Sequence, residues 1–219
     1  MTTPASQTDD RHYKPGIGCF IIGLGLFMLV GSLSYALYRG VQMDREIDTF
    51  TAKTPVVYPV EQPTEAQVSA LREKISAFGE AALAGESVDL ALSAIELNRL
   101  ISSAALLADF RGNTVVTGIG NELIVAEISQ QMNSLMPGNP RWLNATFSFH
   151  PLRTEDTISL QLIDITAPGV EIPRGFISLY AQKKYFQLDA EDPTIGQVIK
   201  EIRRISTAHG ELILSTGSE

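Results

Sequence analysis

The sequence holds few of the residues from which catalytic and metal sites are usually built. It has one cysteine and three histidines in 219 residues. Cys19 lies near the start of a long apolar run, so the chain has no disulfide framework and no cysteine-based metal cluster. A lipoprotein-type anchor is also unexpected, because the modified cysteine of such a signal follows the apolar segment. These absences exclude the cysteine-dependent classes of site.

The histidines form no recognisable catalytic pattern. His12 lies in a polar tail, His150 precedes Pro151, and His209 precedes Gly210. A hydrolase triad needs a nucleophile held by a base and an orienting acid, and neither of the later histidines has a nucleophile motif nearby. We therefore expect no catalytic residue, no cofactor and no enzymatic activity.

Two other motifs lack the neighbours that their chemistry requires. Gly118-Ile119-Gly120 has neither the further glycines nor the following helix of a phosphate-binding loop, so we interpret it as a turn between strands. The acidic residues at 155–156 and 189–192 lack the spaced oxygen ligands of a calcium loop. We therefore predict no metal site.

Positive charge is scarce in most of the chain. From residue 54 onward 12 Lys and Arg face 20 Asp and Glu, so this region carries the whole net charge of −8, while residues 1–53 balance at 5 against 5. An acidic region is poorly suited to nucleic acid or to adhesion to anionic lipid, because both need clustered basic residues. The basic residues at 183–184 and 200–204 lie where helices are expected to end, which is a favourable place for positive charge. We expect no nucleic-acid partner.

The chain does contain one long apolar run. No charged residue lies between Lys14 and Arg39, and a helix over residues 16–38 covers the roughly 30 Å hydrocarbon core of a bilayer at about 1.5 Å per residue. We predict a single transmembrane helix here, preceded by a disordered tail over residues 1–15. A cleaved signal peptide is the alternative, because residues 34–36 resemble a cleavage site. The run nevertheless exceeds the roughly 7–15 apolar residues of a typical signal core.

The charges beside this span do not fix its orientation. Arg11 and Lys14 precede it, and Arg39 and Arg45 follow it, so the two flanks are balanced. A short polar tail before an uncleaved signal-anchor usually stays in the cytoplasm. We therefore expect a single-pass protein of the cell membrane, with a cytoplasmic N-terminus and an extracytoplasmic domain.

Small side chains recur along the span. Gly18, Gly25 and Ser32 are seven residues apart, which places them along one stripe of a helix. Small residues let a second helix backbone approach closely within a membrane. The stripe is a candidate helix–helix contact, although the strict G-x-x-x-G spacing is missing.

A tether and one domain are expected after the span. Pro55, Pro59 and Pro63 disfavour a continuous helix, so residues 39–63 are interpreted as an extended linker. The domain then occupies residues 64–219.

Several amphipathic helices are predicted in this domain. The T-x-x-Q pattern at Thr64 and the S-x-x-E pattern at Ser93 both resemble capping boxes. Asp192-Pro193 is a good N-cap and first-turn pair. The helices are expected over residues 64–84, 94–108, 176–186 and 192–206, and a strand is the alternative for the third because of its β-branched and aromatic residues. The second of them has a broad apolar face and is expected to be central to the core.

Between these helices the apolar residues recur with a period of two. Strands are expected over residues 88–92, 114–117, 122–131, 142–149, 157–166 and 211–215. Each strand would have one solvent-exposed face and one buried face, which favours an antiparallel sheet. Asn98, a polar residue among apolar neighbours, is expected to bond a backbone group beside the sheet. The fold class is therefore α+β, with a single N-terminal transmembrane helix followed by one domain in which an antiparallel sheet packs against amphipathic helices.

Three features follow one another in the order of a known family. The span precedes a helix with the sequence IELNRLI at residues 95–101, alternating strands come next, and a G-x-x-x-P turn at residues 169–173 leads into a helix ending in Lys184-Tyr185. This order resembles the YpmS-like family of uncharacterised bacterial single-pass membrane proteins, over residues 88–216. The resemblance implies a curved antiparallel sheet that wraps a long helix, as in tubular lipid-binding modules, and fold alone implies no function.

Two hypotheses of function follow. In the first, the chain is an accessory or interaction protein of the cell envelope without catalytic activity, and its span holds the domain near a partner. In the second, a groove between sheet and helix binds a lipid or another apolar ligand. The candidate lining residues are Phe147, Phe149, Ile158, Leu160 and Leu162. Their spacing also suits an ordinary core.

Overall fold

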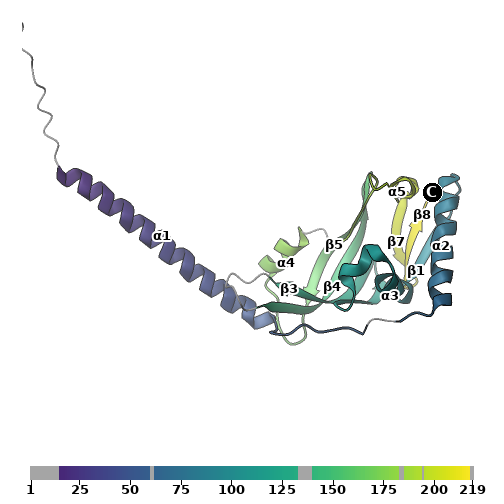
Figure 1. Ribbon diagram of the computed structural model, residues 1–219, viewed down its shortest axis with the longest axis horizontal. Helices are drawn as coiled ribbons and strands as arrows, with labels where there is room; N and C mark the ends of the chain where they lie inside the picture. Colours follow the sequence, from purple (N-terminus) through teal and green to yellow (C-terminus); the bar gives the residue numbers. More distant parts are fainter. Residues whose placement is uncertain (1–14, 60–61, 133–139, 183–184, 194, 218–219) are drawn as a thin grey trace, which may run out of the picture. The chain divides into compact units, whose positions relative to one another are not determined.

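The structure is a computed structural model of the chain, shown in Figure 1. It describes residues 15–59, 62–132, 140–182, 185–193 and 195–217. The chain forms two compact units, residues 1–46 and residues 47–219. Residues 1–14 of the tail expected over residues 1–15, the centre of the turn expected at 137–140, and the basic pair at 183–184 lie outside the described residues, whereas Pro15 is already helical.

Helix α1 runs from Pro15 to Phe50 without a break (Figure 1). Every side chain from Phe20 to Arg39 is exposed. Among the described residues, α1 is the one helix that is long and apolar enough to cross a membrane, by length and composition. The extended linker predicted from residue 39 is wrong over its first part, because no proline follows the span before Pro55 and the intervening residues accept a helix.

The larger sheet is antiparallel throughout, as the alternating pattern predicted. Its strand order is β2-β3-β4-β5-β6. The strands are β2 (Thr114–Gly120), β3 (Leu123–Met132), β4 (Arg141–Arg153), β5 (Thr157–Thr166) and β6 (Gln187–Asp189). The short strand β6 was not predicted. It begins one residue after the helix expected over residues 176–186, in whose place the structure has the shorter α4 (Arg174–Ala181).

The turn predicted at Gly118-Ile119-Gly120 is wrong. These residues belong to β2, where the register shifts between Val116 and Gly118. The chain reverses instead at Asn121 and Glu122, whose φ angles are 50° and 64°. Two consecutive residues with positive φ form the hairpin loop whose twist matches that of the flanking strands. The glycines therefore accompany a bulge, which is another of their uses in strands.

The smaller sheet joins segments far apart in the sequence. Its order is β1-β8-β7, and all pairs are antiparallel. The strands are β1 (Asp89–Ser93), β7 (Arg204–Ala208) and β8 (Glu211–Ser215). The strands predicted near residues 88–92 and 211–215 are confirmed.

The helix predicted over residues 192–206 is largely wrong. Helix α5 covers Gly196–Glu201 only, and residues 204–208 form β7. The Asp192 carboxylate still accepts a hydrogen bond from the Ile195 amide at 3.2 Å, as an N-terminal cap would. Ile205 has helical spacing from Ile202, yet it pairs with Leu214 of β8. The hairpin turn at His209 and Gly210, with φ angles of 54° and 81°, brings the two strands together.

Both predicted capping boxes are present. In α2 (Glu65–Leu83), Thr64 and Gln67 cap each other's backbone, and in α3 (Ala94–Ser103) Ser93 and Glu96 do the same. A 3-10 helix, η1 (Ala105–Phe110), follows α3. The expectation that this region is central to the core is wrong, because no residue of α3 is fully buried. Helix α3 lies beside β2 and packs with half-buried side chains.

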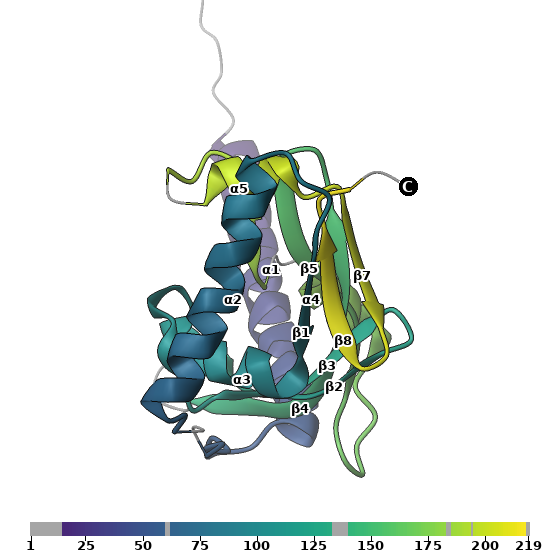
Figure 2. The same ribbon diagram turned by 90° about the vertical axis from the view of Figure 1, so that its right-hand side faces the viewer.

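The second unit has two hydrophobic clusters. The first covers the inner face of the larger sheet and includes Phe147, Phe50, Tyr180 of α4 and Leu212 of β8. The second lies between α2, β1 and α5, and Figure 2 shows α2 running beside β1 and the smaller sheet. The smaller sheet contributes to both clusters and so ties them together.

Residues 51–59 are attached to the larger sheet. Ala52 and Trp142 exchange two main-chain hydrogen bonds of 2.8 Å. The Val56 amide donates to both Ser129 Oγ and Asn144 Oδ1 at 3.1 Å. Just before this segment, Asp48 of α1 forms an ion pair of 2.6 Å with Arg141. This part of the chain is therefore a docked strap and not a free tether.

Candidate functional site

Four of the five predicted lining residues lie in or against the first hydrophobic cluster, and Ile158 lies in the second. Phe147, Phe149, Ile158 and Leu162 are buried, and Leu160 is half-buried against the first cluster. The rings of Phe147 and Phe149 are stacked at 6.0 Å, and each also meets the ring of Tyr185. In the part of the chain that the structure describes, these five side chains line neither of the two cavities described below.

The larger cavity, of about 450 Å³, lies at the edge of β3 in the second unit. Beyond Ile128, β3 has no partner from β2, because β2 begins at Thr114 and Thr114 pairs with Ile128. The wall is built by the end of η1, the segment before β2, strand β3, the start of β4 and the chain after α4. Its residues are Asp109, Phe110, Asn113, Thr114, Ile128, Ser129, Gln130, Gln131, Trp142 and Tyr185.

Two side chains in this wall carry a buried polar atom without a hydrogen-bond partner among the described residues. They are Gln130, through Oε1, and Tyr185, through its hydroxyl. Burial raises the pKa of Tyr185, and the neighbouring Tyr180 adds to the shift. The Tyr185 phenol therefore stays protonated at neutral pH and is a hydrogen-bond donor, whereas Gln130 Oε1 is an acceptor.

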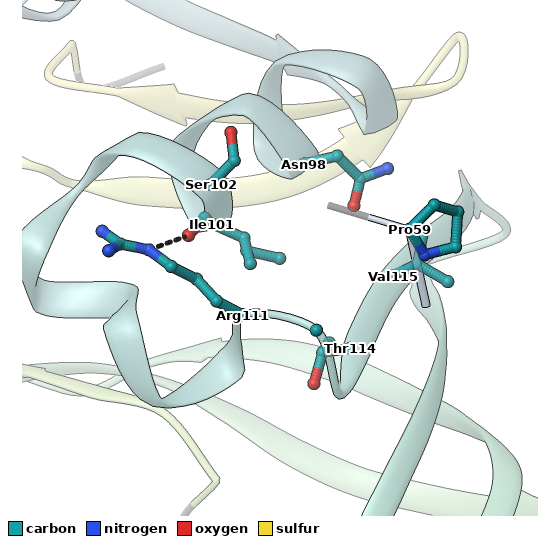
Figure 3. Close-up of a pocket in the computed structure, with 8 residues that line it drawn as sticks. Pro59, Asn98, Ile101, Ser102, Arg111, Thr114 and Val115 are labelled. Atoms are coloured by element: carbon teal, nitrogen blue, oxygen red, sulfur yellow. Dashed lines mark hydrogen bonds between the residues drawn. The ribbon is translucent and has the colours of Figure 1, made fainter. Parts of the chain in front are cut away.

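The smaller cavity, of about 120 Å³, is shown in Figure 3. Arg111 lines it and donates from Nε to the Ile101 carbonyl at 3.0 Å, the dashed line in Figure 3, and from Nη2 to the Ala104 carbonyl at 2.6 Å. Asn98 also lines it and is bonded to the main chain of Val116. These polar side chains hold α3, η1 and β2 together, so the smaller cavity is explained by packing.

His150 and Asp189 have hydrogen-bonding neighbours, and His209 lies in a turn. His150 lies inside β4, and its Nδ1 is 3.0 Å from the Glu122 carbonyl oxygen. His209 occupies the β7–β8 turn. Asp189 accepts a hydrogen bond from the Glu191 amide at 3.0 Å. Among the described residues, no group of three or more His, Cys, Asp or Glu side chains is placed to hold a metal ion.

Two of the three residues of the predicted stripe, Gly25 and Ser32, have open surroundings within the first unit. Gly18, Gly25 and Ser32 all fall in α1. A Cβ at Gly25 would have no atom within 4 Å, and the Ser32 hydroxyl donates to the Leu29 carbonyl at 2.9 Å. The stripe stays a prediction.

The larger cavity was missed at the sequence level. Its wall comes from segments that meet only through the sheet, and none of them forms a motif. One signal was present: Gln130 and Gln131 are consecutive polar residues of β3, of which Gln130 is half-buried and Gln131 is exposed. A comparison of the chain with protein-family models, curated protein sequences and solved structures finds no match.

Proposed function

We propose that this chain is a bitopic protein of the cell membrane whose α+β domain is an accessory or interaction module of the cell envelope, without catalytic activity of its own. The surface of α1 carries the proposal. Twenty consecutive residues, from Phe20 to Arg39, are exposed, and Phe27 is 74% exposed. A continuous apolar surface of this kind marks contact with a membrane or another protein.

In this proposal the N-terminus is cytoplasmic and the acidic domain is extracytoplasmic. The short polar tail supports this orientation. Because an acidic domain adheres poorly to anionic lipid, α1 alone attaches the chain to the membrane in this proposal. Membership of the YpmS-like family is part of the same proposal and rests on the sequence features at residues 88–216.

Membrane extraction tests the anchor. The full chain should stay in the pellet after washing at alkaline pH, and replacing Leu29 and Leu33 together by Arg should release it, because charge near the bilayer centre is costly. Val57→Arg is the matched control, since Val57 is an exposed apolar residue of the second unit. A wild-type chain in the aqueous fraction, with an N-terminus after Ala36, would establish a cleaved signal peptide instead.

Two further measurements test orientation and the accessory role. Protease added to sealed cells should digest the domain if it is extracytoplasmic. The full chain, extracted in a mild detergent, should run as one complex of fixed stoichiometry larger than the 23.8 kDa monomer. A lone monomer under all extraction conditions would contradict the accessory role.

A further inference from the structure

Helix α4 is fixed to the second unit through one of its two sides. Tyr180 is buried, and the Phe176 ring stacks on the Tyr180 ring with 4.4 Å between centroids. The same Phe176 ring meets the Phe50 ring edge-on at 4.8 Å, and Ile177 packs against the first hydrophobic cluster. The core therefore accounts for these apolar residues of α4 and leaves its other side uncovered.

The exposed side of α4 carries no charge beyond its first residue, Arg174. Gly175, Ser178 and Leu179 are exposed, and Leu179 is 60% exposed. Helix α2 of the same unit differs, because its exposed side is charged. The charged residues on that side are Glu65, Arg72, Glu73, Lys74 and Glu80. A helix that faces water normally presents such residues, so the outer side of α4 is not that of a typical solvent-facing helix.

Acidic residues are also absent from the chain around α4. The region from residue 54 onward has 20 Asp and Glu, yet none of them lies between Glu171 and Asp189. Arg174 is exposed, and an arginine can bind a lipid phosphate while its apolar stem lies along the protein surface. The exposed side of α4 is therefore better suited to lipid head groups than the acidic remainder of the domain.

Phe50 limits how far α4 can lie from the proposed membrane. It is the last residue of α1 and comes 11 positions after Arg39, where the apolar run ends. At about 1.5 Å per residue, the helix between them is about 16 Å long, and this limit holds at any tilt of α1. The polar head groups already occupy roughly 5–8 Å on each side of the hydrocarbon core. Since the Phe176 ring contacts Phe50, the length of the chain keeps α4 near the surface of a bilayer that α1 spans.

We propose that the exposed side of α4 is a second contact with the membrane, in which Leu179 inserts among the lipid head groups. This contact rests on the proposed function, because it needs α1 as the anchor. One leucine and one arginine are too few to hold a free acidic domain on a bilayer. Because α1 already keeps the domain at the surface, the contact has only to orient it.

A spin label beside Leu179 tests this contact in the full chain. Cys19 is the single cysteine, so Cys19→Ser combined with Ser178→Cys gives one labelling position on the exposed side of α4. The labelled chain is placed in phosphatidylcholine nanodiscs. Electron paramagnetic resonance then measures collisions of the label with oxygen, which concentrates in lipid, and with a water-soluble nickel chelate. Ser69→Cys in the same background is the matched control, because Ser69 is an exposed serine of α2 that also forms one local hydrogen bond.

The label at position 178 should collide more often with oxygen and less often with the chelate than the label at position 69. Equal collision rates at the two positions, in a chain that co-elutes with the discs, overturn the α4 contact while the anchor stands. Few collisions with either reagent at position 178 mean that protein covers α4, which also overturns the lipid contact. A chain that does not co-elute with the discs contradicts the anchor and the contact that rests on it.

A charge at Leu179 then separates lipid contact from packing. Leu179→Glu should lower the ratio of docked to undocked domain about tenfold, because it replaces the inserted leucine by a carboxylate. Collisions of the label at position 178 with the chelate should rise, while the chain stays in the discs and melts like the wild type. Leu83→Glu, at a 55% exposed leucine that ends α2, is the matched control and should leave these collisions unchanged. Equal collision rates in Leu179→Glu and Leu83→Glu overturn the insertion of Leu179.

Discussion

The side chain of Asn98 pairs with the main chain of Val116 as a neighbouring strand would. Its Nδ2 donates to the Val116 carbonyl at 2.8 Å, and the Val116 amide donates to its Oδ1 at 2.8 Å. Val116 lies on β2, an edge strand of the larger sheet. Edge strands present unpaired main-chain groups, and Asn98 satisfies two of them from α3. The sequence-based expectation for Asn98 is thereby confirmed.

Replacement of Asn98 by Leu should destabilise the second unit by about 2 kcal/mol, because both hydrogen bonds to Val116 are lost. Asn98→Asp should lose only part of this stability, since the carboxylate keeps the acceptor for the Val116 amide and lacks the donor for the Val116 carbonyl. Thermal unfolding followed by circular dichroism measures both. Gln197→Leu, at an exposed position of α5, is the control and should change stability by less than about 0.5 kcal/mol. Equal melting of Asn98→Leu and the control would show that α3 does not protect the edge.

The features predicted correctly are those encoded locally. The capping boxes at Thr64 and Ser93 depend on residues three positions apart, and the alternation in β4 depends on residues two apart. Residues 204–208 show the limit of such reasoning. Their apolar spacing continues that of α5, but pairing with β8 decides their structure, and that pairing is a tertiary contact.

The larger cavity could not be predicted for a related reason. Its wall comes from four separate segments of the chain, represented by Phe110, Gln130, Trp142 and Tyr185. Only the register of β3 against β4 and the return of the chain after α4 place these segments around one space. Phe147 and Phe149 were chosen instead because alternation identifies inward-facing residues. It does not separate a filled core from a cavity.

The docking of the strap can be tested at Asn144. Its Oδ1 accepts hydrogen bonds from the Val56 amide and from Ser129, and its Nδ2 donates to the Thr54 carbonyl. Asn144→Ala should therefore speed amide hydrogen exchange at Val56 while leaving exchange within β4 slow. Thr146→Ala, at the next outward position of the same strand, is the control. Exchange at Val56 that does not change would mean that the Ala52–Trp142 pair alone holds the strap.

Two glycines in short helices should respond oppositely to alanine. A Cβ at Gly196 would clash with the Ala190 carbonyl oxygen and lie 2.7 Å from the Ala190 carbonyl carbon, so Gly196→Ala must displace α5. We expect a loss of about 1–3 kcal/mol in stability, as for other overpacked sites. A Cβ at Gly175 in α4 meets no atom within 4 Å, and Gly175→Ala should stabilise the fold by about 0.5–1 kcal/mol. Chemical denaturation compares the two, and a destabilising effect of the same size in both would contradict the steric argument.

Glu96 links α3 to α2 in a way that depends on pH. Burial raises the pKa of its carboxyl, but the hydrogen bonds from Lys74, 2.6 Å away, and from Ser93 outweigh this effect, so the pKa lies below its ordinary value. The Glu96 carboxyl therefore binds a proton more readily in the unfolded chain than in the folded chain. The contribution to stability is fully present above the unfolded pKa and is lost as the pH falls through the folded pKa.

Glu96→Gln should remove this acid-dependent part of the stability. Glutamine also suits the third position of a capping box, so the helix start is kept. Because the pair is partly exposed, the loss at neutral pH should be below about 1 kcal/mol. Melting curves from about pH 7 to about pH 3 should fall less steeply for Glu96→Gln than for the wild type. Glu155→Gln, in an exposed loop, should follow the wild type, and a slope unchanged by Glu96→Gln would exclude a role for the pair.

Replacement of Tyr185 by Phe should increase the free energy of unfolding of the second unit. The Tyr185 hydroxyl is buried and has no partner among the described residues, so its removal relieves a desolvation cost of about 1–3 kcal/mol while the ring keeps its contacts with Phe147 and Phe149. Most truncations of buried side chains destabilise, so an increase in melting temperature is a distinctive result. Thermal unfolding of delipidated protein is the measurement, and Tyr180→Phe, which loses a bonded hydroxyl, should melt below the wild type.

The opposite result at Tyr185 would have a definite meaning. A lower melting temperature for Tyr185→Phe would show that the hydroxyl already has a hydrogen-bond partner in solution. A higher melting temperature would mean that the buried hydroxyl costs stability, while the ring contacts with Phe147 and Phe149 are kept.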